Sequence, residues 1–248
     1  MNCCKFKYWY GAAALVILTI AITAKPQGDS RATNQPIAGD PGPSATIGAK
    51  PSMADDKTAV LFNGSSWSGW KSKDGSQSQW VVQDDGSIKS AGADAVSSKS
   101  FGDFQLHLEF LCPKMPDAKG QARSNSGVYL HGRYEIQILD TFGQDPSKNG
   151  CGALYNIAPP MVNASRPPGK WQTYDIVFRA PRFDDEDKVS ELPRVTVLHN
   201  GIVIHNNLEV KNTTPGGLDR EMVKTGPLLL QFHGDPVRYG NIWIRPLD

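Results

Sequence analysis

The segment 125–140 carries the side chains of this sequence that are best suited to moving protons. If it is extended, as one strand or as two adjoining strands, one face is apolar and the other carries His131, Arg133, Glu135 and Gln137. An imidazole, a guanidinium, a carboxylate and an amide in one row can bind hydroxyl groups and transfer protons. The segment therefore predicts a catalytic face on which Glu135 or His131 is the base. The alternative is a polar sheet face that is merely solvated.

A second segment offers similar groups. His107 and Glu109 alternate with apolar residues over 104–110, which is typical of a strand with one buried face. If this strand lay beside the first, Glu109 would approach Glu135, and close carboxylates raise the pKa of one of them. The alternative is a solvated histidine–glutamate pair. Together with residues near the C-terminus, the expected substrate contacts are His107, Glu109, Gln137, Gln231, His233 and Trp243, the last of which could stack on a sugar ring or lie in the core.

Glu135 and Asp140 also bracket a stretch that resembles the E-x-D-x-x-E strand of laminarinase-type glycoside hydrolases. Such enzymes need a pair of carboxylates at a fixed separation. Here Gln137 stands at the middle acidic position, and an aspartate replaces the last glutamate. Asp140 is therefore a fourth catalytic candidate, and two-carboxylate hydrolysis is an alternative mechanism. The sequence contains neither a G-x-S-x-G nor an H-E-x-x-H motif.

The elements that would position these groups are strands. Apolar and polar residues alternate with period two over 104–110, 173–178 and 228–233, and no long stretch has helical periodicity. Asn200-Gly201 between two apolar runs predicts a tight hairpin. Further strands are expected at 59–62, 79–83, 87–90, 96–99, 126–139 and 240–246. Many short strands with Gly/Pro turns predict an all-β fold, and the length favours a jelly-roll β-sandwich.

The N-terminal region predicts export. Lys5 and Lys7 precede an apolar stretch at 11–24, which has the proportions of a secretory signal peptide. We expect residues 1–24 to be the signal, 25–57 to be a disordered Pro/Gly/Ala-rich linker and 58–248 to be the folded domain. The mature chain would then act in the periplasm or outside the cell, or stay anchored in the membrane by an uncleaved signal. The formal net charge of +1 and the lack of basic runs argue against a nucleic-acid partner.

Cysteine usage leaves the redox state open. Cys112 and Cys151 are the cysteines outside the predicted signal, and they could pair in an oxidising compartment or stay as buried free thiols. No C-x-x-C spacing indicates a zinc site. The sequence requires no cofactor, although a divalent metal held by histidine and carboxylate groups remains an alternative. It does not decide the oligomeric state.

Several blocks of the sequence, in order along the chain, resemble the 3-keto-disaccharide hydrolase family. They are LFNGSSWSGW (61–70), FGDFQLHLEF (101–110), NSGVYLHGRYEIQILDTFG (125–143), CGALYNIAPP (151–160), KWQTYDIVFRAPRF (170–183), VTVLHNGIVIHNN (195–207) and NIWIRPL (241–247). The resemblance implies a concanavalin-A-like lectin/glucanase sandwich over about residues 58–248. It departs from the family pattern at Phe232, where an acidic residue is often found, and at Gly240, where arginine is expected.

The resemblance also implies a chemistry and a carbohydrate substrate. A ketone at C3 of a sugar acidifies the proton on C2, so a base can remove it and the C1 substituent can leave. Glu135 or His131 would be the base, and Arg133 or His233 would hold the developing oxyanion. We therefore expect an exported enzyme that cleaves glycosidic bonds of 3-keto-glycosides or disaccharides. The alternatives are a non-catalytic lectin-like module, which would tolerate loss of Glu135, and a structural surface protein.

Overall fold

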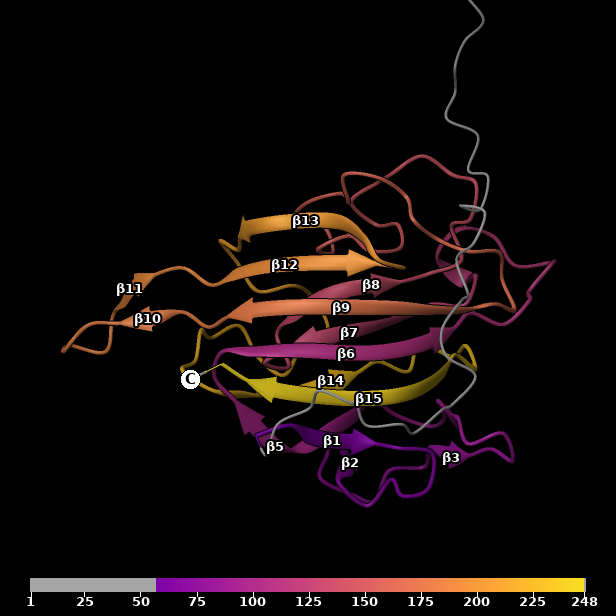
Figure 1. Ribbon diagram of the computed structural model, residues 1–248, viewed down its shortest axis with the longest axis horizontal. Coiled ribbons are helices and arrows are strands. Elements are labelled where there is room, and N and C mark those ends of the chain that lie inside the picture. Colours follow the sequence, from indigo (N-terminus) through magenta and orange to yellow (C-terminus); the bar gives the residue numbers. More distant parts are fainter. Residues whose placement is uncertain (1–56, 248) are drawn as a thin grey trace, which may run out of the picture. The chain divides into compact units, whose positions relative to one another are not determined.

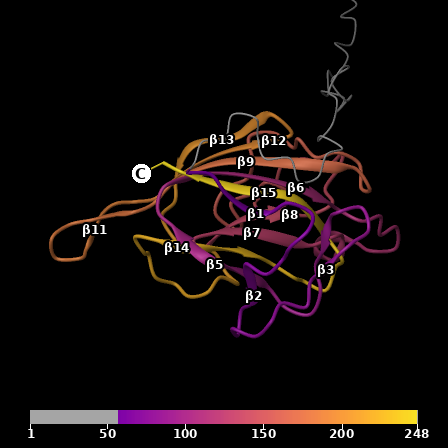
Figure 2. The same ribbon diagram turned by 60° about the horizontal axis from the view of Figure 1, so that its bottom comes forward.

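The computed structural model describes residues 57–247. The predicted signal segment and all of the predicted linker except Lys57 lie outside the described residues. Within 57–247, two antiparallel sheets pack face to face, and a short two-stranded ribbon extends from them (Figures 1 and 2). The single helical element among these residues is a 3₁₀ turn at Gly120–Ala122. The prediction of an all-β jelly-roll sandwich is confirmed.

The larger sheet has eight strands and lies in front in Figure 1. Its strand order is β13-β12-β9-β6-β15-β4-β3, and β1 pairs with β15. The bounds are β13 (Ile202–Glu209), β12 (Arg194–His199), β9 (Trp171–Arg179), β6 (Phe104–Leu111), β15 (Arg238–Pro246), β4 (Ile88–Lys89), β3 (Val81–Val82) and β1 (Ala59–Phe62).

The smaller sheet has five strands in the order β2-β5-β14-β7-β8. The bounds are β2 (Trp70–Ser72), β5 (Ala95–Phe101), β14 (Gly226–Leu230), β7 (Ser126–Leu130) and β8 (Tyr134–Ile138), and the ribbon consists of β10 (Arg182–Phe183) and β11 (Val189–Glu191). Within 57–247, no helix is long and apolar enough to cross a membrane.

The core lies between the two sheets, because each sheet turns its apolar alternate residues inward. On β6, Leu106 and Leu108 are fully buried and face the other sheet, and Tyr174 and Ile176 do the same on β9. The smaller sheet contributes Val128, Leu130, Tyr134, Ile136, Ile138, Leu228 and Leu230. Burying one such aliphatic side chain stabilises the fold by roughly 1.5–3 kcal/mol, so this layer fixes which residues of each strand face outward.

Two turns bear on the sequence predictions: one confirms an expected hairpin and the other decides between two alternatives. Asn200 and Gly201 have φ of 53° and 79° and join β12 to β13, so the predicted hairpin is confirmed. The segment 126–139, for which the sequence left one strand or two adjoining strands open, is two strands. His131 and Gly132 have φ of 52° and 69°, so the chain turns there and β7 pairs antiparallel with β8.

Cys112 and Cys151 are both buried and are not joined in a disulfide. Of the two alternatives, a disulfide or free thiols, the structure has the free thiols. Burial raises the pKa of each thiol above its usual value. Cys151 Sγ lies 3.2 Å from the hydroxyl of Tyr174, which donates to the backbone carbonyl of Gln137. The two thiols therefore belong to the packed interior.

Candidate functional site

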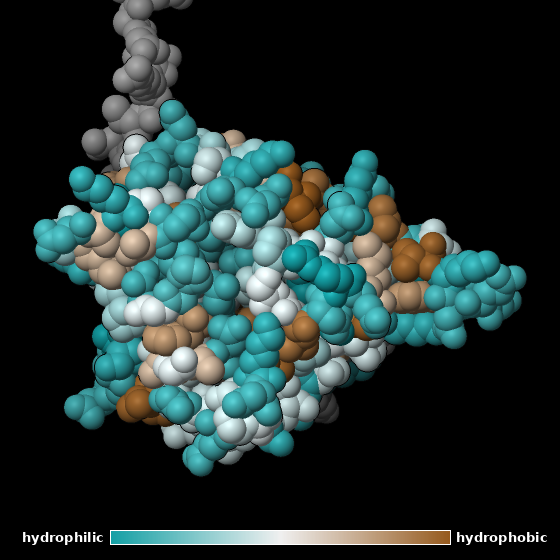
Figure 3. All heavy atoms as spheres, turned by 180° about the vertical axis from the view of Figure 1, so that it is seen from behind, coloured by the Kyte–Doolittle hydropathy of each residue, from teal (hydrophilic) through white to brown (hydrophobic). Residues whose placement is uncertain are grey.

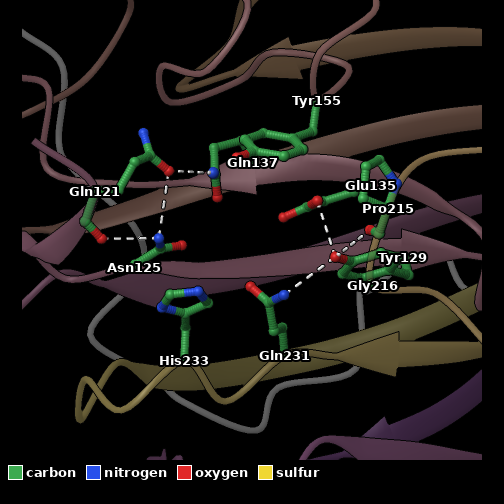
Figure 4. Close-up of a pocket in the computed structure, with 10 residues that line it drawn as sticks. All are labelled: Gln121, Asn125, Tyr129, Glu135, Gln137, Tyr155, Pro215, Gly216, Gln231 and His233. Carbon is green, nitrogen blue, oxygen red and sulfur yellow. Dashed lines mark hydrogen bonds between the residues drawn. The ribbon is translucent and has the colours of Figure 1, made fainter.

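A pocket of about 260 Å³ opens on the outer face of the five-stranded sheet. This face is seen in Figure 3, where it is mainly hydrophilic. Strands β7 and β8 form the floor, and loops before β7, after β8, before β14 and after β14 supply the walls (Figure 4). The lining residues are Gln121, Asn125, Tyr129, Glu135, Gln137, Tyr155, Pro215, Gly216, Gln231 and His233.

Glu135 is the carboxylate of this lining. It sits on β8 with Tyr134 and Ile136 in the core on either side, so strand alternation directs it to the pocket. The residue is 2% exposed. Burial raises the pKa of Glu135 to about 8, although a hydrogen bond from the Tyr129 hydroxyl opposes the rise. A carboxyl group with this pKa can exchange protons near neutral pH.

Tyr129 lies directly across from Glu135 in the β7–β8 register. Its hydroxyl is 2.9 Å from Glu135 Oε2 and 3.0 Å from the Pro215 carbonyl oxygen, and it accepts a hydrogen bond of 3.1 Å from the Gln231 amide. Burial and the nearby Glu135 raise the pKa of Tyr129 far above its usual value, so the phenol stays protonated. Tyr129 thus links the floor of the pocket to two of its walls.

A group of carboxamides lines the end of the pocket opposite Tyr129. The Asn125 amide nitrogen donates to the backbone carbonyl of Gln121 at 2.8 Å, and the Gln137 amide nitrogen lies 3.3 Å from Gln121 Oε1. The side-chain oxygens of Asn125 and Gln137 are buried and have no hydrogen-bond partner. Figure 4 shows both side chains directed at the space beside Glu135. Unsatisfied buried acceptors suit a ligand with hydroxyl groups.

The segment 214–219 forms a wall that is hydrogen-bonded to the start of β8. Thr214 N–H donates to the Arg133 carbonyl, and the Thr214 hydroxyl accepts from Glu135 N–H at 2.9 Å. Arg133 forms a two-pronged ion pair with Asp219, with Nε 2.6 Å from Oδ1. Lys73 Nζ donates to the carbonyl oxygens of 216 and 217 at 3.0 and 2.8 Å. These contacts hold the wall against the floor.

The remaining walls come from the loops after β8 and β14. Tyr155 N–H donates to the Glu135 carbonyl at 3.1 Å, which fixes the loop that carries the Tyr155 ring over the pocket. Gln231 and His233 follow β14 on one side of the chain, and between them Phe232 N–H donates to Asp94 at 2.9 Å. Burial raises the pKa of Asp94, which lies behind this wall.

The pocket brings together part of the predicted site. Glu135, Gln137, Gln231 and His233 all line it. The turn at 131–132 removes His131 and Arg133 from the face that the sequence predicted for them. His131 packs among core aromatic rings and its Nε2 lies 3.1 Å from the Gly102 carbonyl, while Arg133 is held by Asp219. Burial lowers the pKa of His131.

Asp140 lies past the end of β8, outside the pocket lining, and is paired with Arg123 at 2.6 Å. His107, Glu109 and Trp243 lie on the outer face of the eight-stranded sheet, because their strand neighbours point into the core. Strands β6 and β8 therefore belong to different sheets, and Glu109 does not approach Glu135. On its own face, His107 contacts Asp175 at 2.7 Å and stacks on Trp243.

Sequence reasoning missed six lining residues, which are Gln121, Asn125, Tyr129, Tyr155, Pro215 and Gly216. The sequence does contain a signal for Tyr129. A tight turn at His131-Gly132 would predict a hairpin in which Tyr129 lies across from Glu135. The others come from loops whose position depends on tertiary packing. Within 57–247, no three histidine, cysteine or acidic side chains converge as metal ligands would.

Comparison with known proteins gives a family match over nearly the whole described region. The model of the 3-keto-alpha-glucoside-1,2-lyase-like domain matches residues 57–245. No curated protein matches the chain. A crystal structure named "putative glycosyl hydrolase" from Parabacteroides distasonis ATCC 8503 is 36% identical with a TM-score of 0.71, over 77% of this chain and 84% of that one.

Two further crystal structures with the same name and organism are more distant. One is 23% identical with a TM-score of 0.57, over 77% of this chain and 94% of that chain. The other is 19% identical with a TM-score of 0.53, over 77% of this chain and 100% of that chain. At these identities the likeness shows the fold, which is the same two-sheet architecture.

Proposed function

Because the chain belongs to the family of 3-keto-alpha-glucoside-1,2-lyase-like domains and is a glycosyl hydrolase-like protein, we propose that its pocket cleaves the glycosidic bond of a 3-keto-glycoside, with Glu135 as the base that removes the C2 proton. The observation that carries this proposal is the position of Glu135 on the pocket floor, buried, with its pKa raised to about 8.

The proposed reaction is an elimination followed by addition of water. The C2–H bond breaks, its proton goes to Glu135, and the electron pair forms an enolate with the C3 carbonyl. Collapse of the enolate breaks the C1–O bond and forms a C1–C2 double bond, and the leaving oxygen takes up a proton. Water then adds across the double bond, so the net change is hydrolysis. A donor is needed at the enolate oxygen, and His233 is the sequence candidate that lines the pocket.

The make-up of the lining supports elimination over two-carboxylate hydrolysis. Among the residues that line the pocket, Glu135 is the single carboxylate. Two-carboxylate glycosidases place a second one about 5–9.5 Å from the first across the substrate. Asp140, the sequence candidate for that role, is paired with Arg123 instead. Removal of a proton next to a ketone needs one base and a hydrogen-bond donor.

The test compares wild-type protein with Glu135→Gln on a 3-keto-glycoside and on the same glycoside without the ketone. The substitution keeps the size of the side chain and removes the base, so turnover should fall by roughly 10²–10⁴. Exchange of the C2 proton with heavy water should fall in parallel. Glu186→Gln, at the exposed tip of the β10–β11 ribbon, is the matched control and should keep full activity. Equal turnover by Glu135→Gln and wild type would exclude Glu135 as the base.

The pH dependence gives a second readout. The base form of Glu135 is the ionised form, so kcat/KM should rise about tenfold per pH unit below 8 and level off above it. Each assay is run with and without added divalent metal, because the proposed mechanism uses no metal ion. A metal requirement would contradict it.

A carbohydrate-binding role without catalysis is the second candidate. The unpartnered side-chain oxygens of Asn125 and Gln137 favour it, since they would accept bonds from sugar hydroxyls whether or not a bond is cleaved. A binder would retain affinity in Glu135→Gln and show no C2 exchange in the wild type. Calorimetry with 3-keto and ordinary glycosides separates this outcome from catalysis.

We also propose that the protein acts outside the cytoplasm, on the strength of Lys5, Lys7 and the apolar stretch at 11–24. N-terminal sequencing of protein recovered from the source cell tests this. A mature chain that begins near residue 25 would support export, and an intact Met1 in a soluble cytoplasmic fraction would contradict it.

A further inference from the structure

The hydroxyl of Tyr129 has more acceptors than protons. It receives a hydrogen bond from Gln231 Nε2 at 3.1 Å, which occupies one lone pair of its oxygen. Its single proton then has two acceptors within reach, Glu135 Oε2 at 2.9 Å and the Pro215 carbonyl oxygen at 3.0 Å. A phenol can serve only one of them well at a time.

The Pro215 carbonyl, the second acceptor for the Tyr129 hydroxyl, is held in place by hydrogen bonds on both sides of it. Thr214 N–H donates to the Arg133 carbonyl at 2.9 Å, and Leu218 N–H donates to the Gly132 carbonyl at 2.8 Å, so both ends of 214–218 are tied to the turn between β7 and β8. Lys73 holds the middle through two backbone carbonyls. The ion pair between Arg133 and Asp219 holds the chain immediately after this segment.

The Tyr129 hydroxyl lies close to the backbone of Gly216. Gly216 has φ of +83°, and a Cβ at that position would lie 2.6 Å from the Tyr129 hydroxyl oxygen. On the opposite side, the other carboxylate oxygen of Glu135, Oε1, lies over Gly127 and receives no hydrogen bond from residues 57–247. One oxygen of Glu135 is therefore held and the other is free for substrate.

We propose that Tyr129 is a positioning residue that presents Oε1 of Glu135 to the substrate and switches its own hydrogen bond as Glu135 gains and loses a proton. When Glu135 is ionised, the hydroxyl donates to Oε2. When Glu135 takes up the C2 proton at Oε1, Oε2 becomes the carbonyl oxygen of the acid and a weaker acceptor, and the hydroxyl turns to the Pro215 carbonyl. This assignment rests on the proposed role of Glu135, and it gives the phenol proton a fixed acceptor in both protonation states.

The switch predicts the behaviour of Tyr129→Phe, which removes only the hydroxyl. Ionised Glu135 then loses its donor while protonated Glu135 loses less, so the pKa of Glu135 should rise further, by about one unit. Tyr134→Phe is the matched control, because Tyr134 is the neighbouring buried tyrosine and its hydroxyl has no partner. It should leave the titration of Glu135 unchanged.

The measurement is carbon-13 NMR of glutamate carboxyl groups in the full chain, with Glu135→Gln identifying the resonance. It needs no substrate, so it decides the role of Tyr129 even if no 3-keto-glycoside is turned over, an outcome that would overturn the proposed function alone. If turnover is found, the rising limb of the kcat/KM profile should move to higher pH by the same amount. An unchanged Glu135 titration in folded Tyr129→Phe overturns the inference.

Gln231→Met provides a second variant should Tyr129→Phe fail to fold. Without the Gln231 amide donor, the phenol is a weaker donor to Oε2, so the pKa of Glu135 should again rise, by less than in Tyr129→Phe. A titration identical to that of wild type in Gln231→Met would count against the network.

Discussion

Gly127 lies beneath the carboxylate of Glu135, and a Cβ atom on Gly127 would stand 2.4 Å from Glu135 Oε1. The two residues are on adjacent strands, since Gly127 pairs with Gln137 and Tyr129 pairs with Glu135. The absence of a side chain at Gly127 therefore shapes the floor on which Glu135 rests.

Gly127→Ala should displace Glu135 while leaving the sandwich folded. Its φ is not in the left-handed region, and the atoms that a Cβ meets belong to the flexible end of one side chain. A displacement of about 1 Å can lower turnover about 10²-fold. Kinetics and thermal melts of Gly127→Ala should show a large loss of kcat with a small change in Tm. Gly69→Ala, where a Cβ meets nothing within 4 Å, is the control and should match wild type in both.

The burial of Glu135 should make the stability of the folded protein depend on pH. Its folded pKa is raised from 4.5 to about 8, so the folded state binds the proton more tightly than the unfolded state. Stability is therefore present at low pH and is lost as pH rises from about 4.5 through 8. Glu135→Gln removes this loss and should melt several degrees above wild type at pH 9, with little difference at pH 4.5. A variant that is less stable than wild type at pH 9 would contradict the burial argument.

His107 should act on stability over a somewhat higher pH range, in the same direction, and should not act on activity. Burial lowers its pKa, but hydrogen bonds to Asp175 and Glu109 outweigh this and raise it to about 9. Its contribution is complete below about pH 6.5 and is lost as pH rises through 9. Asn241 and Trp243 are its other neighbours, and neither titrates in this range.

Asp175→Asn should therefore lower Tm most near pH 6 and least near pH 10, with turnover unchanged. Melting curves across this range check the window. Asp145→Asn, at an exposed position, is the control and should show no pH-dependent difference from wild type. A loss of sugar binding in Asp175→Asn would return this face to the list of substrate contacts.

The side-chain oxygens of Asn125 and Gln137, which have no hydrogen-bond partner in the protein, should contribute to sugar binding. Asn125→Ala and Gln137→Met each remove a buried oxygen that lacks a partner. Each also removes an amide donor to Gln121, so the fold should lose about 1 kcal/mol of stability. Loss of one hydrogen bond to a sugar hydroxyl should raise KM roughly three- to tenfold with kcat nearly constant. Gln105→Met, on a strand of the other sheet, is the control. Unchanged KM in both pocket variants would place the sugar elsewhere.

The sequence predicts the sandwich well because its signal is local. Alternation on β6, β9 and β14 is set by burial of every second residue, and the turn at Asn200-Gly201 is set by two adjacent residues. The same alternation placed Glu135 and Gln137 on one face correctly. It failed at His131, where a turn with positive φ breaks the period and sends that side chain into the core.

The rest of the pocket depends on distances that no local pattern encodes. Tyr155 reaches the pocket because its loop bonds to the edge of β8, and Pro215 reaches it because Thr214 and Leu218 bond to residues of the β7–β8 turn and the start of β8. These contacts join segments that are tens of residues apart in the chain. They follow from how the loops pack on the finished sheet.

Alkylation of the two buried cysteines can be used to measure how readily the folded structure opens. Cys112 and Cys151 are fully enclosed, and burial keeps both thiols protonated, so an alkylating dye has neither access nor a thiolate to attack. Modification of either residue, followed for each peptide by mass spectrometry, would therefore require the structure around that residue to open. The rate would report how readily the closed structure opens around each cysteine, without an engineered label.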